Sequence, residues 1–342
     1  MRLICIEEHA VDLPIVRASQ PALDREAPYM RSPSPGRAPH SARTKERPSL
    51  VDLSEAVRLG ADLGEGRIQA MDEHGIDMQI VSYSSPAQLA PADQAVELTR
   101  AANDRLAKAV TANPQRLAGF AVLPWQAPLA AAEELDRAVT ELGLKGVLIV
   151  GRPGETFLDD PRYEPVLRKI TDLQVPLYLH PFNPLPQVQQ VYYAGLSDGV
   201  TNGFSLSGWG WHHEAGIHLL RLILSGVFER FPTLQVVSGH WGEMVPFYLS
   251  RLDAVMPTGV TGLSKSITET YRSNVWVTPS GMFDAPQFQF IRDTIGVDRL
   301  IWSVDYPYLT LDGTRSFLDS LPISDEELQK ITHLNAEALF RI

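Results

Sequence analysis

Glutamate, histidine and aspartate residues end four short apolar runs that lie far apart in the sequence. Buried parallel strands appear as continuous apolar runs rather than alternating ones. A side chain that follows such a strand lies at its carboxyl end, where α/β barrels build their active sites. The pattern therefore predicts a barrel enzyme whose site draws on Glu7, His9, His180, His240 and Asp305.

The types of these residues indicate metal chemistry. Glu7 and His9 are two residues apart, so their side chains project from the same face of a strand. With His180 and Asp305 they offer two imidazoles and two carboxylates, which suit Zn or another borderline divalent ion such as Mn. A single such residue is more typical of a hydrogen-bonded strand end. Four of them at strand ends favour one divalent metal ion, with zinc as the first expectation.

The rest of the chain alternates strand-like and helix-like segments, which is the pattern of a (β/α)8 TIM barrel forming a single domain over residues 1–342. A doubly wound sheet is the alternative, but it should show G-x-G-x-x-G after an early strand, and this sequence does not. The expected strands are residues 3–6, 78–82, 117–122, 146–150, 177–180, 235–238, 275–278 and 300–304.

Two insertions interrupt this rhythm, and both follow the carboxyl end of a strand. Residues 10–53 are rich in Pro, Arg and Ser, and the basic part, residues 31–47, is predicted to be a mobile loop. Residues 181–213 contain six large aromatic side chains and are predicted to form a lid and a subunit contact. Both insertions should lie over the barrel mouth.

The composition excludes several classes of protein. Of the 342 residues 44% are hydrophobic and 21% are charged, as in an ordinary globular protein. The net charge of −11 argues against nucleic acid as a partner, because phosphate binding requires clustered Lys and Arg. No uncharged stretch is long enough to span a bilayer. The single cysteine, Cys5, excludes an internal disulfide and predicts a cytoplasmic protein.

At these residues the chain resembles the metal-dependent amidohydrolase superfamily. The branch that it resembles includes aminocarboxymuconate semialdehyde decarboxylase and the γ-resorcylate and 2,3-dihydroxybenzoate decarboxylases. The resemblance runs nearly end to end and rests on Glu7-Glu8-His9, Tyr178-Leu179-His180-Pro181, Gly239-His240-Trp241-Gly242-Glu243, Ser303-Val304-Asp305-Tyr306-Pro307 and the closing Asn335-Ala336-Glu337-Ala338-Leu339-Phe340.

The resemblance implies a role for each matching residue. Glu7, His9, His180 and Asp305 would bind one metal ion, and His240 would be a catalytic histidine beside it. Glu243 matches an acidic residue of the same motif. Arg251 matches an arginine associated with the substrate carboxylate, in some relatives across a subunit boundary.

The chain also departs from the superfamily pattern. Binuclear members use a carboxylated lysine at the end of strand four, whereas Lys145 here lies at the start of that strand, so one metal is expected. Leu309 stands where relatives often have an acidic residue, which leaves the identity of the substrate open. His212 and His213 have two interpretations, as substrate contacts or as ordinary polar residues at the start of a helix. Both are left outside the predicted site.

Two reactions fit this ligand set. The first is non-oxidative decarboxylation of a hydroxylated aromatic carboxylic acid, with Asp305 as proton donor and His240 tuning it. The second is hydrolysis of a lactone or a C–C bond by a metal-activated water. The Glu7-x-His9 start and the aromatic insertion favour decarboxylation. A scaffold without activity is the third alternative, although all the ligand positions are intact.

The expected assembly is a homodimer or homotetramer. Six large aromatic side chains in one insertion would leave a sizeable apolar patch on a monomer unless they fold over their own barrel mouth. Arg251 lies eight residues after Glu243, about two helical turns from the barrel rim, which suits contact with a partner or a lid.

Overall fold

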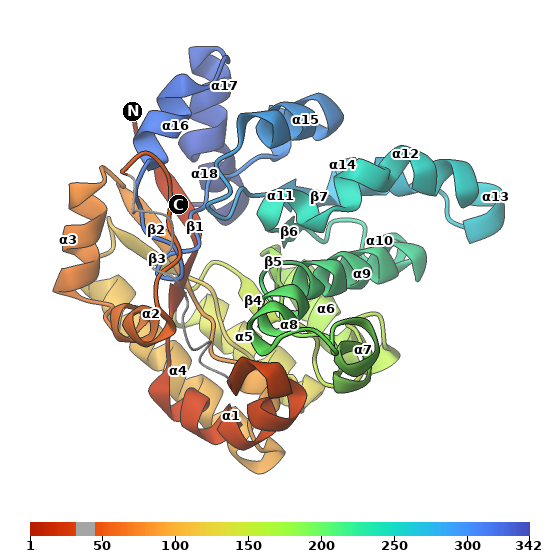
Figure 1. Ribbon diagram of the computed structural model, residues 1–342, viewed down its shortest axis with the longest axis horizontal. Coiled ribbons are helices and arrows are strands. Elements are labelled where there is room, and N and C mark those ends of the chain that lie inside the picture. The colour runs from red at the N-terminus through yellow and green to blue at the C-terminus, as the bar shows by residue number, and fades with distance from the viewer. Residues whose placement is uncertain (32–44) are drawn as a thin grey trace.

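The computed structural model describes residues 1–31 and 45–342, and at its centre parallel strands form a ring surrounded by helices (Figure 1). The described strands form two parallel sheets with the orders β1-β2-β3 and β4-β5-β6-β7. They are β1 (Ile4–Ala10), β2 (Met78–Tyr83), β3 (Leu117–Gly119), β4 (Val147–Val150), β5 (Leu177–His180), β6 (Val236–Ser238) and β7 (Val275–Val277).

Isolated parallel bridges join the two sheets and close the ring. Residues 300–303 take the place of the eighth strand, between β7 and β1. The backbone N–H of Ile301 donates to the carbonyl of Val277 at 3.0 Å, and that of Ile6 donates to Trp302 at 2.9 Å. The eighth strand consists only of the bridges Val277↔Leu300 and Ile6↔Ser303, and the bridge Ala121↔Val147 joins the two sheets on the other side. The predicted (β/α)8 barrel is therefore confirmed.

Two apolar layers hold the barrel together. The larger layer lies between the strands and the surrounding helices. The smaller one is built from alternate strand residues and includes Ile6, Ile80, Phe120 and Tyr178. Phe340, from the last helix, belongs to the same small cluster and packs 5.4 Å from Phe120, ring to ring. The C-terminal helix therefore contacts the interior of the barrel.

Helices alternate with the strands as the sequence predicts, with ends shifted by a few residues. α9 ends at Leu224, and Gly226, with a φ of 72°, begins the short helix α10 as its N-cap residue. The helices are α1 (Leu13–Glu26), α2 (Leu53–Gly60), α3 (Glu65–Glu73), α4 (Ala92–Ala112), α5 (Pro128–Thr140), α6 (Glu164–Leu173), α7 (Pro186–Tyr192), α8 (Asp198–Ser205), α9 (Gly210–Leu224), α10 (Val227–Arg230), α11 (His240–Glu243), α12 (Val245–Val255), α13 (Thr258–Thr261), α14 (Ile267–Asn274), α15 (Ala285–Ile295), α16 (Thr314–Ser320), α17 (Asp325–Gln329) and α18 (Asn335–Phe340).

The two insertions contact each other. The first contains α1, and the second contains α7, α8 and the start of α9. The side chains of Asn183 and Gln189 both donate to the backbone carbonyl of Glu26, and Asn202 donates to that of Tyr29 at 2.6 Å. The insertions thus meet on one side of the barrel. Most of the basic stretch predicted to be mobile, residues 32–44, lies outside the described residues.

Among the helices that the structure describes, none combines the length and the apolar character that a membrane span requires.

Candidate metal centre and active site

The first predicted ligands lie within β1 rather than after it. The sequence predicts a strand that stops at Ile6, but β1 continues to Ala10 through a bulge between Cys5 and Glu8. Glu7 is the extra residue and has a φ of 62°, in the left-handed region. Bulges redirect side chains locally. This one resets the alternation so that Glu7 and His9 both reach the same cluster, while Glu8 accepts the Val304 N–H at 2.9 Å.

Glu7 is a fully buried carboxylate with one satisfied oxygen and one free oxygen. Its Oε2 accepts hydrogen bonds from the hydroxyls of Thr278 and Ser303, each at 3.1 Å, and from that of Ser280. Its Oε1 has no hydrogen-bond partner. Burial raises the pKa of Glu7, opposed by the nearby charge of His240. A cation beside Oε1 would remove this penalty.

His9 and His180 direct their Nε2 atoms toward the carboxylates of Asp305 and Glu7. The ring N–H at Nδ1 of His180 donates to the carbonyl of Pro181 at 2.8 Å, and Nδ1 of His9 lies 3.2 Å from Ser82 Oγ. These contacts at Nδ1 fix the ring orientation, as second-sphere bonds do for metal-binding histidines. Burial lowers the pKa of His180 well below its ordinary value, with a further decrease from the charges of His9 and His240. His180 is therefore a neutral imidazole, which is the ligand form.

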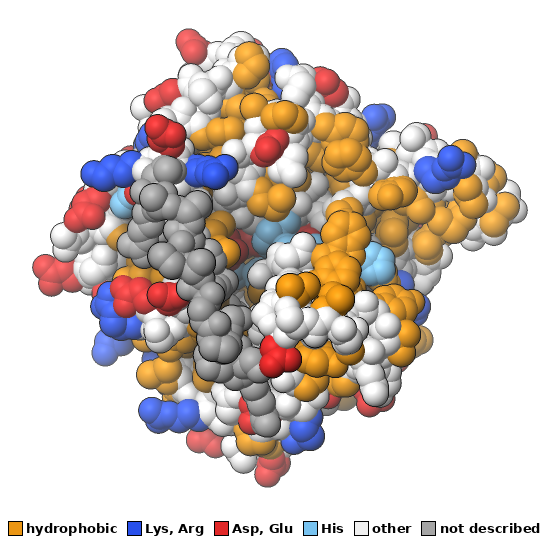
Figure 2. Space-filling model, viewed as in Figure 1, with side chains coloured by type: hydrophobic (Ala, Val, Ile, Leu, Met, Phe, Trp, Pro, Cys, Tyr) orange, Lys and Arg blue, Asp and Glu red, His pale blue; other side chains and the backbone are white. Residues whose placement is uncertain are grey.

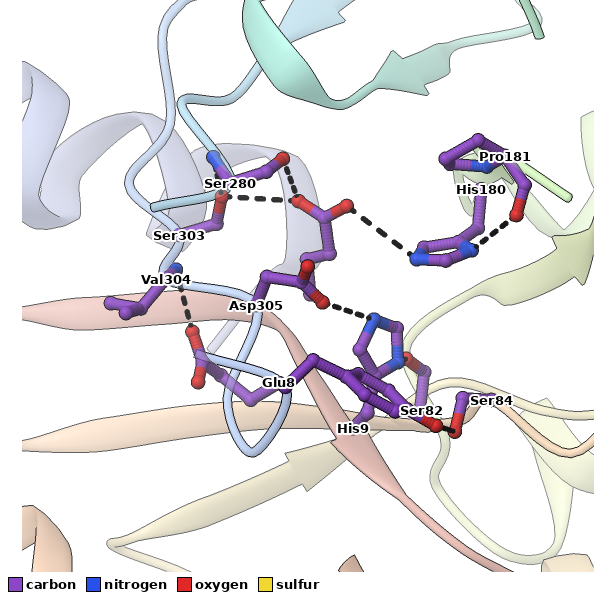
Figure 3. A network of polar contacts seen from close by, with 12 residues as sticks. Glu8, His9, Ser82, Ser84, His180, Pro181, Ser280, Ser303, Val304 and Asp305 are labelled. Atoms are coloured by element: carbon purple, nitrogen blue, oxygen red, sulfur yellow. Dashed lines mark hydrogen bonds and ion pairs between the residues drawn. The ribbon is translucent and has the colours of Figure 1, made fainter. Parts of the chain in front are cut away.

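All four predicted ligands converge on one space, and Figure 3 shows His9, His180 and Asp305 pointing toward one another. Asp305 Oδ1 lies 3.2 Å from His9 Nε2, and Glu7 Oε1 lies 3.9 Å from His180 Nε2. The ligand atoms of Glu7, His9 and His180 all lie within 4.8 Å of one another. Glu7 Oε1, His9 Nε2 and Asp305 Oδ1 are buried and have no hydrogen-bond partner. Buried polar atoms are rarely left unpaired, so these donor atoms fit a divalent cation.

His240 reaches the cluster from a left-handed turn that follows β6. All five residues from His240 to Met244 have φ between 48° and 84°. Such a conformation costs roughly 1–2 kcal/mol for each residue other than glycine. At Gly242 a Cβ atom would lie 2.5 Å from the hydroxyl oxygen of Tyr271, so this position accepts only glycine. Strain of this kind is typical of functional sites.

The turn brings Glu243 beside His240. Nδ1 of His240 donates to Glu243 Oε1 at 2.8 Å, which leaves Nε2 3.9 Å from Asp305 Oδ2. Burial by itself would lower the pKa of His240, but the charge of Glu243 and this hydrogen bond raise it to about 9. The pKa of Glu243 is lowered, because the charges of His240 and His212 outweigh the burial that would raise it. The carboxylate of Glu243 therefore favours the protonated form of the His240 imidazole.

Two other residues named by the sequence lie apart from this cluster. Arg251 is exposed on α12, and no hydrogen bond or ion pair of its side chain is recorded with the residues that the structure describes. Lys145 precedes β4, and its Nζ lies 3.5 Å from the backbone carbonyl of Arg341. The other end of β4, at Val150, is the end that pairs with His180. This placement agrees with the expectation from the sequence that Lys145 is not a metal ligand.

Sequence reasoning missed the hydroxyl groups that hold Glu7. Thr278 and Ser280 follow β7, and Ser303 lies in the eighth strand segment. The same criterion that selected His180, a polar residue directly after an apolar strand, would have selected Thr278 and Ser280. His212 was named by the sequence but left outside the predicted site, because a polar residue near a helix start has no distinguishing pattern, and its hydrogen bond to Glu243 was not foreseen.

This architecture defines a metal-dependent barrel enzyme, and the chain belongs to the amidohydrolase family, whose model matches residues 47–342. It is 36% identical to the gamma-resorcylate decarboxylase of a Polaromonas species over 295 residues, 82% of this chain and 88% of that protein.

Two solved structures are similar over nearly the whole chain. The first is 5-carboxyvanillate decarboxylase from Sphingomonas paucimobilis, with a TM-score of 0.84, 29% identity and coverage of 100% of this chain and 99% of that one. The second is a dihydroxybenzoic acid decarboxylase from Polaromonas with bound manganese and the inhibitor 2-nitroresorcinol. Its TM-score is 0.82 and its identity 31%, with coverage of 99% of this chain and 97% of that one.

We predict that His180→Ala loses most of its bound metal, because the substitution removes one of only two imidazole nitrogens in the cluster. Elemental analysis after dialysis should give a small fraction of one ion per chain, against about one for the parent protein. His213→Ala, an exposed histidine outside the cluster, is the matched control and should retain its metal. Full retention in His180→Ala would remove His180 from the ligand set.

We predict that His240→Ala keeps its metal but loses at least ~100-fold in kcat, the scale expected of a positioned acid–base group. The physical reason is that His240 Nδ1 is occupied by Glu243 while Nε2 faces the cluster. Turnover and metal content should be measured on the same preparation. Near-normal turnover would contradict a catalytic role, and loss of metal would make His240 a ligand instead.

Proposed function

We propose that this protein is a metal-dependent carboxy-lyase that decarboxylates a hydroxylated aromatic carboxylic acid without an oxidant. The main support is the set of buried atoms without a hydrogen-bond partner, Glu7 Oε1, His9 Nε2 and Asp305 Oδ1. His240 lies next to this set, with Nδ1 3.9 Å from Glu7 Oε1 and Nε2 3.9 Å from Asp305 Oδ2. Relatives that match over most of the chain act on dihydroxybenzoates and related acids by their names. The shared fold and the names of these relatives therefore support the same class of reaction for this chain.

The proposed cofactor is one divalent metal ion held by Glu7, His9, His180 and Asp305. Two carboxylates and two imidazoles suit both zinc, the first expectation from the sequence, and manganese. The manganese in a related decarboxylase structure supports manganese as the second candidate. Loading the metal-free protein with each ion separately, followed by activity measurement, distinguishes the two.

The chemistry is the exchange of a carboxylate for a proton on a ring carbon. A bound divalent ion would supply Lewis-acid stabilisation to the carboxylate and ortho-hydroxyl oxygens of the substrate. The bond from the ring carbon to the carboxylate breaks, the electron pair stays on the ring carbon, and CO2 leaves. Asp305 and His240, whose Oδ2 and Nε2 atoms are 3.9 Å apart, together deliver the proton to that carbon.

Glu243 acts through His240 in this proposal. Its carboxylate holds Nδ1–H of the imidazole at 2.8 Å, so the ring cannot turn and Nε2 stays directed toward Asp305. The charge of Glu243 also favours the protonated imidazole. Buried and hydrogen-bonded on both oxygens, Glu243 itself does not face the cluster.

Hydrolysis of a lactone or a C–C bond is the second candidate, since the ligand set is equally able to activate a water. We predict decarboxylation instead, and the test is a panel of hydroxybenzoates and lactones incubated with metal-replete protein. CO2 release should occur only with acids that have a hydroxyl ortho to the carboxylate. In D2O the product should contain deuterium at the carbon that lost CO2. Acid production from a lactone without CO2 release would favour the hydrolase.

The proposed assembly is a homo-oligomer, a dimer or a tetramer, formed through the projecting helices. Phe247, Tyr248 and Val255 on α12 are each at least 60% exposed, and Arg251 lies on the same helix among them. Figure 2 shows hydrophobic side chains gathered on the projection that contains α12 and α13. Exposed apolar areas of this kind are typical of protein interfaces. Tyr192, Phe204 and Trp209 of the second insertion are also exposed.

We propose that Arg251 binds the substrate carboxylate in the site of the partner subunit. Arg251→Ala and His180→Ala should each be nearly inactive. When the two variants are mixed and their subunits exchange, mixed dimers should contain one complete site, restoring up to about a quarter of parent activity. Arg17→Ala, an exposed arginine on α1, is the control and should keep full activity. No restoration in mixed dimers, or a strictly monomeric protein in sedimentation, would contradict this role.

We also propose that residues 1–342 act as one catalytic domain. The cytoplasmic location stays a prediction from the single cysteine, Cys5, which is buried.

A further inference from the structure

His212, in the first turn of α9, lies beside His240 and shares the Glu243 carboxylate with it. Its Nδ1 is 2.8 Å from Glu243 Oε2, just as Nδ1 of His240 is 2.8 Å from Glu243 Oε1. The two imidazole rings lie 4.4 Å apart, centroid to centroid. One buried carboxylate is therefore shared by two histidines, from the turn after β6 and from the end of the second insertion.

The proton on His212 Nδ1 is fixed by its surroundings. A carboxylate only accepts hydrogen bonds in its ionised form, so Nδ1 must be the donor to Glu243. Nε2 of His212 has two neighbours of opposite kind, the indole N–H of Trp211 at 3.0 Å and the carbonyl of Ser207 at 2.9 Å. A neutral ring accepts from Trp211, and a protonated ring donates to Ser207. The bond from Nδ1 to Glu243 persists in both forms.

Without this bond the Glu243 carboxylate would be held on one side only. Glu243 is 2% exposed, so no bulk water would replace the lost donor, and an unsatisfied buried oxygen would favour a rotated side chain. Rotation would move Oε1 away from Nδ1 of His240. The imidazole would then lose the contact that directs its Nε2 toward Asp305.

The three side chains also lie close enough for a second cation site. That alternative is less favourable because both carboxylate oxygens of Glu243 already accept an imidazole N–H at 2.8 Å. In the first cluster, by contrast, Glu7 Oε1, His9 Nε2 and Asp305 Oδ1 have no hydrogen-bond partner. The hydrogen bonds account fully for the grouping of His212, His240 and Glu243.

We propose that His212 is a positioning residue for the decarboxylation reaction: it holds Glu243 so that the carboxylate orients His240 toward the metal cluster. The inference rests on the proposed function and adds a residue that the sequence-based site did not include. It also gives the second insertion a defined task, since the segment that ends at Trp211 and His212 fixes the orientation of the acid–base histidine.

The first test compares His212→Ala with His212→Asn and with His213→Ala. In His212→Ala kcat should fall by roughly 10–100-fold, the range for partners that orient an active-site group, with unchanged metal content. KM should change by less than about twofold, because in this proposal His212 acts through Glu243 and not on the substrate. An asparagine N–H can replace Nδ1–H, so His212→Asn should recover most of the activity. The exposed neighbour His213 should be replaceable without effect.

The second test measures whether His212 acts through Glu243. The His212→Ala substitution should have much less effect on kcat in a Glu243→Gln background than in the parent protein, since the interaction is then already lost. Equal fold-losses in the two backgrounds would overturn the proposal. So would the same loss in His213→Ala, or a loss confined to KM.

A third measurement does not depend on the reaction. In the 15N-labelled holoenzyme, the ring Nδ1–H resonance of His240 should shift or broaden in His212→Ala and return in His212→Asn. An unchanged His240 resonance would overturn the positioning role even in an active enzyme. If instead the parent enzyme releases no CO2 from any hydroxybenzoate while this resonance responds, the proposed reaction fails and the positioning role remains.

Discussion

The burial of an ionisable carboxylate at Glu7 is the constraint around which the rest of this site is arranged. Removing a carboxylate from water costs several kcal/mol even after the protein relaxes. Hydroxyl donors from Thr278, Ser280 and Ser303 offset part of that cost, at about 1.5–3 kcal/mol for each hydrogen bond to a charged group. They reach only Oε2. Oε1 remains unpartnered, and the nearby His180 stays neutral because burial lowers its pKa. A metal cation is the group that balances this arrangement, which explains why a protein interior tolerates it.

The backbone at the strand ends is shaped for the same purpose. Left-handed φ values occur at Glu7, at the five residues that begin with His240, at Ser280 and at Asp305. These positions follow or interrupt four different strand segments, and they bring the polar side chains of Glu7, His240, Ser280 and Asp305 together. Gly239 allows the close approach, since a Cβ there would lie 2.7 Å from Glu7 Oε1. The well-packed layers on both sides of the strands hold conformations that an isolated loop would not keep.

A continuous line of hydrogen bonds and close contacts connects the centre of the barrel with its outer parts. Asp305 faces Nε2 of His240, Glu243 binds both His240 and His212, and His212 contacts Trp211 of the second insertion. The same turn that positions Glu243 leads directly into α12, where Arg251 lies on an exposed, partly apolar helix. The chemistry of the site, the insertion over the barrel and the proposed subunit contact therefore all depend on the short segment after β6.

The barrel, the order of its elements and the four residues that converge on the cluster could all be predicted from the amino-acid sequence. This was possible because buried parallel strands give uninterrupted apolar runs, and because polar residues at their ends are conspicuous against them. Three features became visible only in the folded chain: the bulge at Glu7, the hydroxyl groups that follow β7 or lie in the eighth strand segment, and the pairing of His212 with Glu243. These features join residues between 31 and 296 positions apart along the chain. Contacts of that kind leave no local pattern, since they depend on how strands and helices pack and not on the periodicity within any one of them.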